Sequence, residues 1–386
     1  MKKCIVISDS FKGSLPSRDI CAIARERIPL YFPACEVRAL NVADGGEGTV
    51  DCFLDSCGGE RVLVSGVQNP YGEPIDAAYG LLPDGTAVVE MAAAAGLPLV
   101  AGRKNPCVTT TYGVGQLIAD ALARGARRIV LGLGGSATND GGCGCAAALG
   151  IHFLDRDGVP FVPVGGTLDR LDRIDASGLD PAVRAADITV MCDIDNPLCG
   201  PNGASAVFGP QKGATPEQVA LLDQALSRYA SVLSSQLGSD AAQRDGAGAA
   251  GGIGCAMMAF FGASFLSGID LVLDAAGFST AVAGADLVLT GEGQLDAQSA
   301  YGKVPCGVAR RAKAVRNVPV LAIGGALGDG AESLYSCGVD ALASTVSRIT
   351  TLESAMANAV ASIEETTART MRLLDAGRKM EQNKVS

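Results

Sequence analysis

Acidic side chains recur beside glycines at the ends of apolar, strand-like segments. These carboxylates belong to Asp9, Asp44, Glu47, Asp140, Asp193, Asp195, Glu292 and Asp296. Lys12, Lys212 and Lys303 border glycines in the same kind of loop. Asp and Gly are common turn residues, and any one of these positions has that ordinary explanation. The joint pattern of acids and lysines in glycine loops indicates a site that holds anions together with a cation.

Phosphoryl transfer requires this set of groups. Backbone N–H groups and lysines hold the phosphate oxygens, carboxylates hold Mg²⁺, and one carboxylate accepts the proton of the attacking hydroxyl. The single histidine, His152, lies in a strand-like segment and is expected at the surface or in a structural role, so the general base is expected to be a carboxylate. No GxSxG motif and no Cys–His pairing is present, which disfavours covalent hydrolase chemistry.

Two well-known nucleotide motifs are absent or incomplete. The segment 293–304 falls short of a Walker A loop, because Ala297 stands where glycine is needed and Val304 follows the lysine. Gly132, Gly134 and Ala137 loosely match the dinucleotide fingerprint, and Asp155 lies near the distance expected for the ribose-binding acid. In that fingerprint the helix begins inside the motif, whereas residues 138–142 are all of a loop type. A P-loop is therefore not supported, and dinucleotide binding is disfavoured.

The segment 126–150 is the strongest candidate for an anion-binding loop. An apolar run at 129–131 leads into GLGGSATNDGG at 132–142, and an alanine-rich, helix-prone segment follows. Glycines let the backbone approach a ligand, and a helix start offers unpaired N–H groups with a partial positive charge. We expect a phosphate cradle here, with polar groups from Ser136, Thr138, Asn139 and Asp140.

Composition narrows the class of protein. The chain has 386 residues, which favours two domains, and its 48% apolar content suits an α/β protein. A formal charge of -10 argues against a nucleic-acid partner. No apolar run is long enough to cross a membrane and no N-terminal signal is visible. The thirteen cysteines include no CxxC pair, so we expect reduced, packed thiols and a cytoplasmic protein.

The order of predicted elements indicates one domain inserted into another. Strands at 4–8 and 36–42, with a helix from an N-cap at Ser17 to about 28, open a parallel sheet. Short strands separated by turns then follow, at 61–64, 75–81 and 86–91, and they indicate a meander that opens a second domain. A later strand at 188–191 and a helix at 215–237 belong to the same insert.

The parallel pattern returns near the C-terminus. The predicted strands are 285–290, 318–323 and 339–343, and the predicted helices are 303–315, 331–337 and 351–374. Two early and three late strands would form a five-stranded doubly wound sheet. We therefore predict a discontinuous domain, 1–60 with 285–376, an inserted α/β domain, 61–284, and a frayed charged tail, 377–386.

The glycine-rich motifs of the chain, taken together, resemble those of the bacterial glycerate kinases. The matching segments run in family order through the chain: DSFKGSL at 9–15, ADGGEGT at 43–49, VEMA at 89–92 with AGL at 95–97, TTTYG at 109–113, GGSATNDGG at 134–142, DNPLCGPNGA at 195–204, FGPQKGA at 208–214, GAAGG at 248–252, and LTGEGQLD at 289–296 with GK at 302–303. The resemblance covers residues 4–375.

The resemblance implies ATP-dependent phosphorylation of D-glycerate, typically at the 2-hydroxyl and alternatively at the 3-hydroxyl, with Mg²⁺ as the metal. It also implies a flavodoxin-like domain built from both chain ends and an insert resembling a restriction-endonuclease core. The expected partners are small molecules, with no nucleic acid and no membrane, and a homodimer is compatible with the sequence.

Residue chemistry suggests a role for each candidate. Nucleotide binding is assigned to Gly134, Gly135, Ser136, Thr138, Asn139, Asp140 and Glu292, with Lys303 on the phosphates as a catalytic group. The glycerate site is assigned to Asp9, Ser10, Lys12, Lys212 and Asn196, with Lys12 or Lys212 meeting the carboxylate. Asp193 and Asp195 are separated by a single residue, so they lie on the same side of an extended chain and are expected to ligate Mg²⁺. Asp296 or Asp44 is the expected base.

A cleft between the two domains is the expected location of the site, where closure would exclude water. The rival class is a non-catalytic nucleotide sensor or an NAD-binding protein that uses the same glycine loops. A sensor would bind nucleotide without releasing ADP in response to glycerate, and an NAD-binding protein would be indifferent to ATP.

Overall fold

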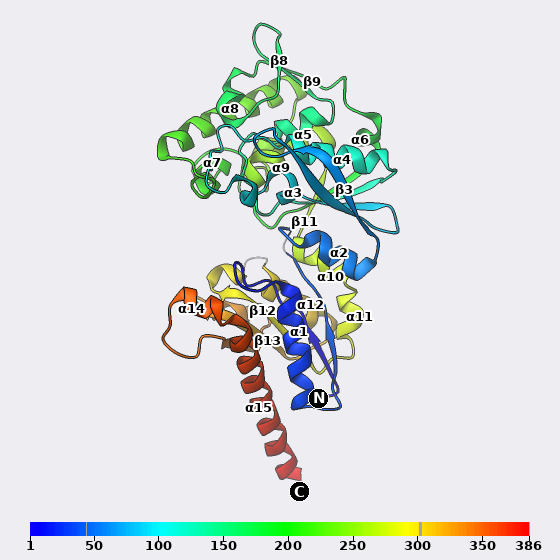
Figure 1. Cartoon of the computed structure of the whole chain (residues 1–386), viewed down its shortest axis with the longest axis vertical. Helices are drawn as coiled ribbons and strands as arrows, with labels where there is room; N and C mark the ends of the chain where they lie inside the picture. The colour runs from blue at the N-terminus through cyan, green and yellow to red at the C-terminus, as the bar shows by residue number, and fades with distance from the viewer. Residues whose placement is uncertain (44, 301–302, 386) are drawn as a thin grey trace. The chain divides into compact units, whose positions relative to one another are not determined.

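The computed structural model describes residues 1–43, 45–300 and 303–385 and separates into two compact units (Figure 1). Unit 1 comprises Met1–Asp44 and Ile269–Ser386, and unit 2 comprises Gly45–Gly268. The boundaries predicted from the sequence pattern lie after residues 60 and 284. Both units combine helices with a sheet that contains parallel strands, so the protein is of the mixed α/β class.

Unit 1 is built on a five-stranded sheet in the order β14-β13-β12-β1-β2. Every neighbouring pair is parallel. The strands are β1 Lys3–Val6, β2 Glu36–Ala39, β12 Leu287–Leu295, β13 Val320–Leu327 and β14 Ala341–Ser344. The prediction of one parallel sheet from two early and three late strands is therefore confirmed.

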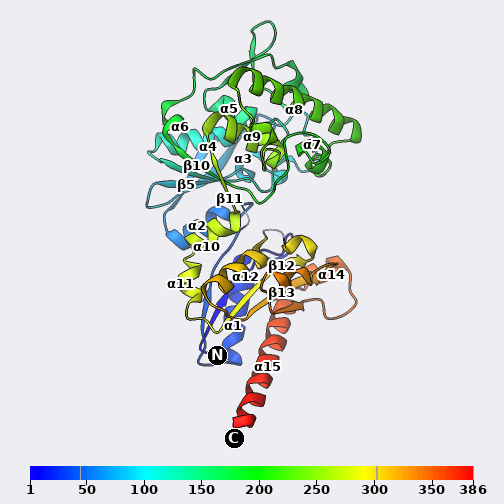
Figure 2. The same cartoon turned by 180° about the vertical axis from the view of Figure 1, so that it is seen from behind.

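Helices cover both faces of this sheet. On one face, α1 and α15 lie side by side (Figure 1), and their buried residues Cys21, Ala24 and Met371 pack on β1 and β12. On the opposite face, α12 packs against β12 and β13 (Figure 2). The helices are α1 Ser17–Arg27, α10 Gly268–Ala275, α11 Phe278–Val282, α12 Val304–Val315, α13 Ser333–Ser336, α14 Leu352–Ala357 and α15 Ala359–Val385.

Three local predictions for unit 1 are wrong. Ser17 is not the N-cap of α1, because Pro16 takes that position and the Ser17 hydroxyl donates to the Ser8 carbonyl at 2.7 Å. The single helix predicted over 351–374 is two helices, because Asn358 leaves the helical conformation and its side chain donates to Ser354 O at 2.7 Å.

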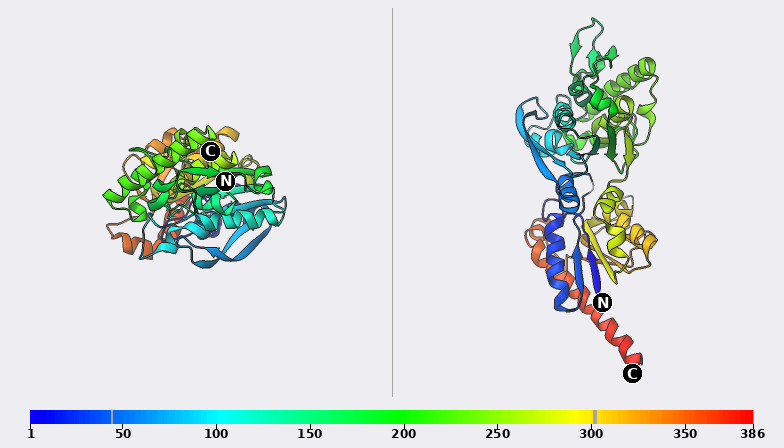
Figure 3. Two further views of the ribbon diagram at one scale, coloured as in Figure 1. Left: turned by 90° about the horizontal axis from the view of Figure 1, so that it is seen from above. Right: turned by 90° about the vertical axis from the view of Figure 1, so that its right-hand side faces the viewer.

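The third error concerns the tail. Residues 377–385 continue α15 and are not frayed, and this end of the helix projects beyond the sheet (Figure 3). Lys, Arg, Glu, Gln and Met have high helix propensity, and Asp375 pairs with Arg378 at 2.6 Å and with Lys379 at 2.8 Å along the helix. Local helical preference thus extends the element past the sheet that it covers.

Unit 2 contains a six-stranded mixed sheet in the order β11-β10-β6-β5-β4-β3. The first four strands in that order are parallel, and β5-β4-β3 form the predicted antiparallel meander. A separate small sheet has the order β8-β7-β9. The strands are β3 Glu60–Gln68, β4 Pro74–Leu81, β5 Thr86–Glu90, β6 Arg128–Gly132, β7 His152–Leu154, β8 Pro160–Phe161, β9 Arg173–Asp175, β10 Asp187–Met191 and β11 Ser264–Leu266.

The helices of unit 2 pack on this sheet through small and apolar residues. The longest, α8, begins as its sequence predicts, because Thr215 and Gln218 form a reciprocal capping box and Pro216 opens the first turn. The α-helices are α2 Thr49–Cys57, α3 Ala92–Ala95, α4 Tyr112–Ala123, α5 Cys143–Ala148, α6 Pro181–Ala185, α7 Ala204–Phe208, α8 Pro216–Leu237 and α9 Ala249–Phe261. Short 3-10 turns occur in the two units at Ile28–Leu30, Leu97–Val100, Gly165–Arg170, Pro210–Lys212, Ala241–Gln243 and Ala297–Ala300.

The structure also shows the environment of the cysteines and of the single histidine. All thirteen cysteines are free and most are buried, as predicted for packed thiols. His152 is exposed on β7, which agrees with its predicted surface role. Within the described part of the chain, no helix has both the length and the apolar character needed to span a membrane.

Close helix packing in unit 2 gives a stability prediction. A Cβ added at Gly115 on α4 would lie 2.4 Å from the Cys145 carbonyl oxygen and 2.7 Å from Ala148 Cβ on α5. Gly115→Ala should therefore lower the free energy of unfolding by about 1–3 kcal/mol, as overpacking usually does. Gly377 on α15 is the matched control, because a Cβ added there would have no neighbouring atom within 4 Å.

Gly377→Ala should leave stability unchanged or raise it by up to about 1 kcal/mol, because alanine favours the helix. Urea denaturation of both variants measures the difference. Equal stability of Gly115→Ala and the wild type would show that α4 and α5 can separate without cost.

Candidate active site

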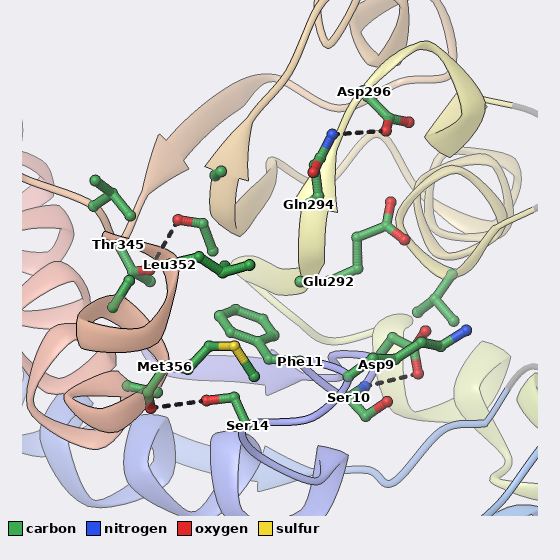
Figure 4. A pocket seen from close by; sticks show the side chains of 18 of the residues that line it. Asp9, Ser10, Phe11, Ser14, Glu292, Gln294, Asp296, Thr345, Leu352 and Met356 are labelled. Atoms are coloured by element: carbon green, nitrogen blue, oxygen red, sulfur yellow. Dashed lines mark hydrogen bonds between the residues drawn. The ribbon is translucent and has the colours of Figure 1, made fainter. Parts of the chain in front are cut away.

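Unit 1 contains a pocket of about 570 Å³ at the carboxyl edge of its sheet (Figure 4). The loop after β1, the end of β12, the start of α12 and the segment from β14 to α15 line it. Predicted site residues that line this pocket are Asp9, Ser10, Lys12, Glu292, Asp296 and Lys303. Residues placed far apart in the sequence, with different predicted roles, therefore share one cavity.

The strand order explains the position of this pocket. β1 pairs with β2 on one side and with β12 on the other. The chain leaves β1 through α1 toward β2, and it leaves β12 through α12 toward β13 on the opposite side. Connections that diverge at a topological switch point leave a crevice at the carboxyl ends of the strands, where open α/β sheets bind ligands.

Glu292 is the most buried charged side chain of the pocket wall. It is 6% exposed, and its Oε2 lies 3.7 Å from Lys303 Nζ at the start of α12. Its Oε1 is buried and has no hydrogen-bond partner among the described residues. Burial raises the pKa of the Glu292 carboxyl, and the neighbouring Ser299, Lys303 and Lys12 oppose this rise. The arrangement can accept a hydrogen bond from a ligand.

The other acids of the pocket accept hydrogen bonds from backbone N–H groups, and Asp296 also accepts one from a side-chain amide. Asp9 is 8% exposed, and its Oδ1 accepts from Ser10 N at 2.7 Å. Asp296 is half-buried, and its carboxylate accepts from Gln298 N at 2.9 Å and from Gln294 Nε2 at 3.2 Å. Both carboxylates therefore also organise the loops that carry them.

The glycine loop after β6 lies in unit 2. The predicted order of strand, loop and helix is confirmed, with β6 ending at Gly132 and α5 beginning at Cys143. Gly134 packs against backbone, because an added Cβ would lie 2.5 Å from Gly46 Cα. Gly135 is exposed with φ of 75°, and Ser136 is 7% exposed. Gly135 is therefore the most accessible of these three positions.

Deeper in the same loop, Asp140 is fully buried and has four hydrogen bonds. Its Oδ2 accepts from Thr111 N and Thr111 Oγ1, both at 2.8 Å, and from Gly144 N at 3.2 Å; its Oδ1 accepts from Gly142 N at 3.0 Å. Burial raises the pKa of Asp140, and these hydrogen bonds oppose the rise. The expectation of unpaired N–H groups at this helix start is wrong for Gly142 and Gly144, because Asp140 itself binds them.

Two neighbours of Asp140 carry buried polar atoms without partners. Asn139 Nδ2 donates to Ser205 Oγ at 3.0 Å, while Asn139 Oδ1 and Thr138 Oγ1 have no hydrogen-bond partner among the described residues. Gly251 of α9 packs directly on this segment, since an added Cβ would lie 2.0 Å from Thr138 O. Close packing by α9 therefore gives this part of the loop a structural reason for small residues.

Lys212 is a buried lysine that contacts the same loop of unit 2. It is 1% exposed, and its Nζ donates to Thr138 O at 2.7 Å. Burial lowers the pKa of Lys212 to about 7, although the charge of Asp140 opposes this shift. Lys212 is thus a buried lysine of unit 2, whereas Lys12 lines the pocket of unit 1 with an exposed side chain.

The predicted metal ligands lie after β10. Asp193 and Asp195 are both exposed, and the Asp193 carboxylate accepts from Gly268 N at 3.1 and 3.2 Å. Asn196 Nδ2 donates to Asn202 O at 2.8 Å. Across residues 1–43, 45–300 and 303–385, no group of three or more His, Cys, Asp or Glu side chains has a metal-binding arrangement.

One predicted site residue lies outside the described residues, and one part of the pocket wall was not predicted from the sequence. Asp44, a predicted base, lies outside the described residues. Residue chemistry did not single out the apolar wall of the pocket, which includes Phe11, Leu352 and Met356. The only signal was that Phe11 follows a strand end inside the motif DSFKGSL, while α14 carries no comparable motif.

The buried lysine predicts a pH dependence of stability. In the unfolded chain Lys212 has its ordinary pKa of 10.5, so between pH 7 and 10 the unfolded state binds one more proton than the folded state. The free energy of unfolding should then rise with pH by up to about 1.4 kcal/mol per unit relative to Lys212→Met. The destabilisation is complete below pH 7 and disappears toward pH 10.5.

Chemical denaturation of the wild type and Lys212→Met at pH 7, 8, 9 and 10 measures this difference. Parallel curves for the two proteins would mean that Lys212 keeps its proton on folding.

Known proteins resemble this chain along almost its whole length. The model of the glycerate kinase family matches residues 4–375. The glycerate kinase of Bacillus subtilis is 46% identical over 366 residues, which cover 94% of this chain and 95% of the relative. The glycerate 2-kinase of Escherichia coli is 44% identical over 360 residues, covering 92% and 94%.

A solved structure agrees with these sequence relationships. The crystal structure of a protein assigned as glycerate kinase 2 of Salmonella typhimurium LT2 superimposes with a TM-score of 0.84 at 43% identity, covering 98% of this chain and 99% of that chain. The pocket that gathers residues 9–12 with the end of β12 thus occurs in a fold shared with this family. The chain belongs to the glycerate kinase family, and it is a phosphotransferase.

Proposed function

We propose that the protein transfers the γ-phosphoryl group of ATP to the 2-hydroxyl of D-glycerate and forms 2-phosphoglycerate. The observation that carries this proposal is the pocket of unit 1, which combines Lys12 and Lys303 with the buried carboxylate of Glu292. Cations can hold a carboxylate and phosphates there, and carboxylates can accept a hydroxyl proton. The name of the Escherichia coli relative, glycerate 2-kinase, supports the 2-hydroxyl as the acceptor.

Glycerate is assigned to Asp9, Ser10 and Lys12. A small anionic acid needs a fixed positive charge, and the exposed ammonium of Lys12 in the pocket supports it over Lys212, which is buried and donates to Thr138 O. Asn196 stays a predicted glycerate contact. The proposed base is Asp296, which lines the same pocket, with Asp44 as the alternative.

ATP phosphates are assigned to Lys303 and to the loop that contains Gly134, Gly135 and Ser136. The accessible backbone at Gly135 supports a direct contact. In this proposal Thr138, Asn139 and Asp140 shape the loop from its buried side, and Glu292 binds the nucleotide. The prediction of a cleft shared by the two domains stays a prediction, as does the role of each loop within it.

Mg²⁺ is assigned to Asp193 and Asp195. Their exposed carboxylates suit this ion, because Mg²⁺ is usually held by one or two carboxylates together with waters and substrate phosphates. When bound, the ion would neutralise charge on the phosphates during transfer. Gly268 N, which donates to Asp193, would fix the direction of that carboxylate.

For the fold, we propose that unit 1 is flavodoxin-like and that unit 2 resembles a restriction-endonuclease core. Numbered within its own sheet, unit 1 has the order 2-1-3-4-5, which is the flavodoxin-like order. The mixed six-stranded sheet of unit 2 supports an inserted α/β core.

Incubation with ATP, Mg²⁺ and D-glycerate tests the function directly. Phosphorus NMR should show ADP and 2-phosphoglycerate, with no product when glycerate or ATP is left out. Formation of 3-phosphoglycerate would contradict the assigned hydroxyl. Nucleotide binding without ADP release would indicate the rival class, a nucleotide sensor.

Substitution of Lys12 tests the glycerate site. Lys12→Ala should raise the KM for glycerate about 10- to 100-fold and leave the KM for ATP within about twofold, because a hydrogen bond to a charged group contributes about 1.5–3 kcal/mol. Lys379→Ala removes an exposed lysine that pairs with Asp375 on α15 and serves as the control. Equal effects of Lys12→Ala on both substrates would remove Lys12 from the acid-binding role.

A further inference from the structure

The pocket of unit 1 has an apolar wall that the roles assigned above do not explain. Phe11 from the loop after β1, Val346 after β14, and Leu352 and Met356 from α14 line one side. Figure 4 shows Phe11, Leu352 and Met356 gathered together, while Glu292 and Asp9 lie toward the other side. The pocket is thus divided into an apolar part and a charged part.

Part of the apolar wall is open to solvent. Leu352 is 77% exposed and Val346 is 40% exposed, and both line the pocket. Exposed apolar surface that lines a cavity is stabilised when an apolar group covers it, and ligand pockets typically combine such walls with a few polar groups. The wall therefore indicates a ligand with an apolar face.

The two substrates of the proposed reaction differ in this respect. Glycerate is a three-carbon acid in which every carbon carries an oxygen, so it has no apolar face to cover these side chains. Adenine is flat and apolar over both faces and is attached to a polar sugar and phosphates. A cavity of about 570 Å³ also lies in the range of about 300–1,000 Å³ usual for larger ligands.

We propose that the apolar wall formed by Phe11, Val346, Leu352 and Met356 binds the adenine base of the nucleotide. This inference rests on the proposed kinase function for the identity of the ligand. The base lies against α14 and the loop after β14, and the sugar and phosphates extend toward Lys303 and Glu292. The buried Oε1 of Glu292, which has no hydrogen-bond partner in the described part of the chain, accepts a hydrogen bond from a sugar hydroxyl.

Two alanines of α14 provide a matched test. Ala355 is half-buried and lines the pocket, whereas Ala357 is exposed on the same helix and does not line it. Ala355→Phe should raise the Kd for ADP, measured by calorimetry without glycerate, by about tenfold or more, which corresponds to about 1.4 kcal/mol. Ala357→Phe should leave the Kd unchanged, and both variants should keep the wild-type KM for glycerate within about twofold.

A second variant avoids any effect of bulk on folding. Leu352→Asp changes an exposed residue in the first turn of α14, where an acidic residue favours the helix. It should weaken ADP binding by several-fold, because a carboxylate replaces the apolar contact with the base. Thermal melts of all three variants should match the wild type.

The outcomes separate this proposal from the proposed function. If the wild type forms no phosphoglycerate but Ala355→Phe and Leu352→Asp weaken ADP binding while Ala357→Phe does not, the base site stands and the kinase proposal fails. If Ala355→Phe and Leu352→Asp raise the KM for glycerate while the Kd for ADP is unchanged, the wall contacts the acid and the base site is overturned. Wild-type ADP binding in both variants also overturns it.

Discussion

The pocket of unit 1 depends on the buried carboxylate of Glu292. A buried negative charge needs a nearby positive charge or hydrogen-bond donors to offset the loss of water. Glu292 is 6% exposed and lies in the second half of β12, still paired with β13, and Lys303 Nζ lies 3.7 Å from its Oε2. An isolated buried charge costs several kcal/mol. Because Lys303 is the N-cap residue of α12, the ion pair links β12, the helix start and the pocket wall.

The same requirement is met differently in unit 2. Asp140 is fully buried, and it is stabilised by hydrogen-bond donors from Thr111, Gly142 and Gly144. Lys212 reaches the same loop through Thr138 O. A protein carboxylate thus takes the N–H groups that a phosphate could take at the start of α5. Hydrogen bonds within unit 2 hold the buried side of this loop, and its accessible backbone is limited to positions such as Gly135.

These two arrangements suit phosphoryl transfer, which depends on positioning and on compensation of charge more than on covalent chemistry by the protein. In unit 1 Lys12 and Lys303 line the same cavity as the carboxylates of Asp9, Glu292 and Asp296, so this cavity offers both positive charge and proton acceptors. The diverging connections of β1 and β12 create the space, and apolar side chains line one part of it.

Much of this protein could be predicted from local patterns. Alternating and continuous apolar runs predicted the five strands of the unit 1 sheet and those of the six-stranded sheet except β11, and the motifs at 9–15 and 289–296 predicted residues that share the pocket. The helix predicted over 215–237 is α8, which starts at Pro216 after the capping box of Thr215 and Gln218. These features depend on nearest neighbours and on side-chain period, which the sequence contains directly.

Other features required the folded chain. Serine is a common N-cap residue, but in the folded chain the Ser17 hydroxyl donates to the carbonyl of Ser8. Gly251 and Gly134 resemble ligand-binding glycines, and only packing shows that backbone lies within 3 Å of their missing Cβ atoms. The role of Asp140 depends on donors from Thr111, which is distant in sequence.

The sequence by itself determined the parallel α/β order, the motifs and the family to which they point. Only the tertiary structure decided which loops share a cavity, which glycines are needed for close packing, and that Leu352 and Met356 line the same pocket as Asp9. The reason is physical: these relations arise from contacts between segments far apart in the chain, where packing and burial outweigh local preference.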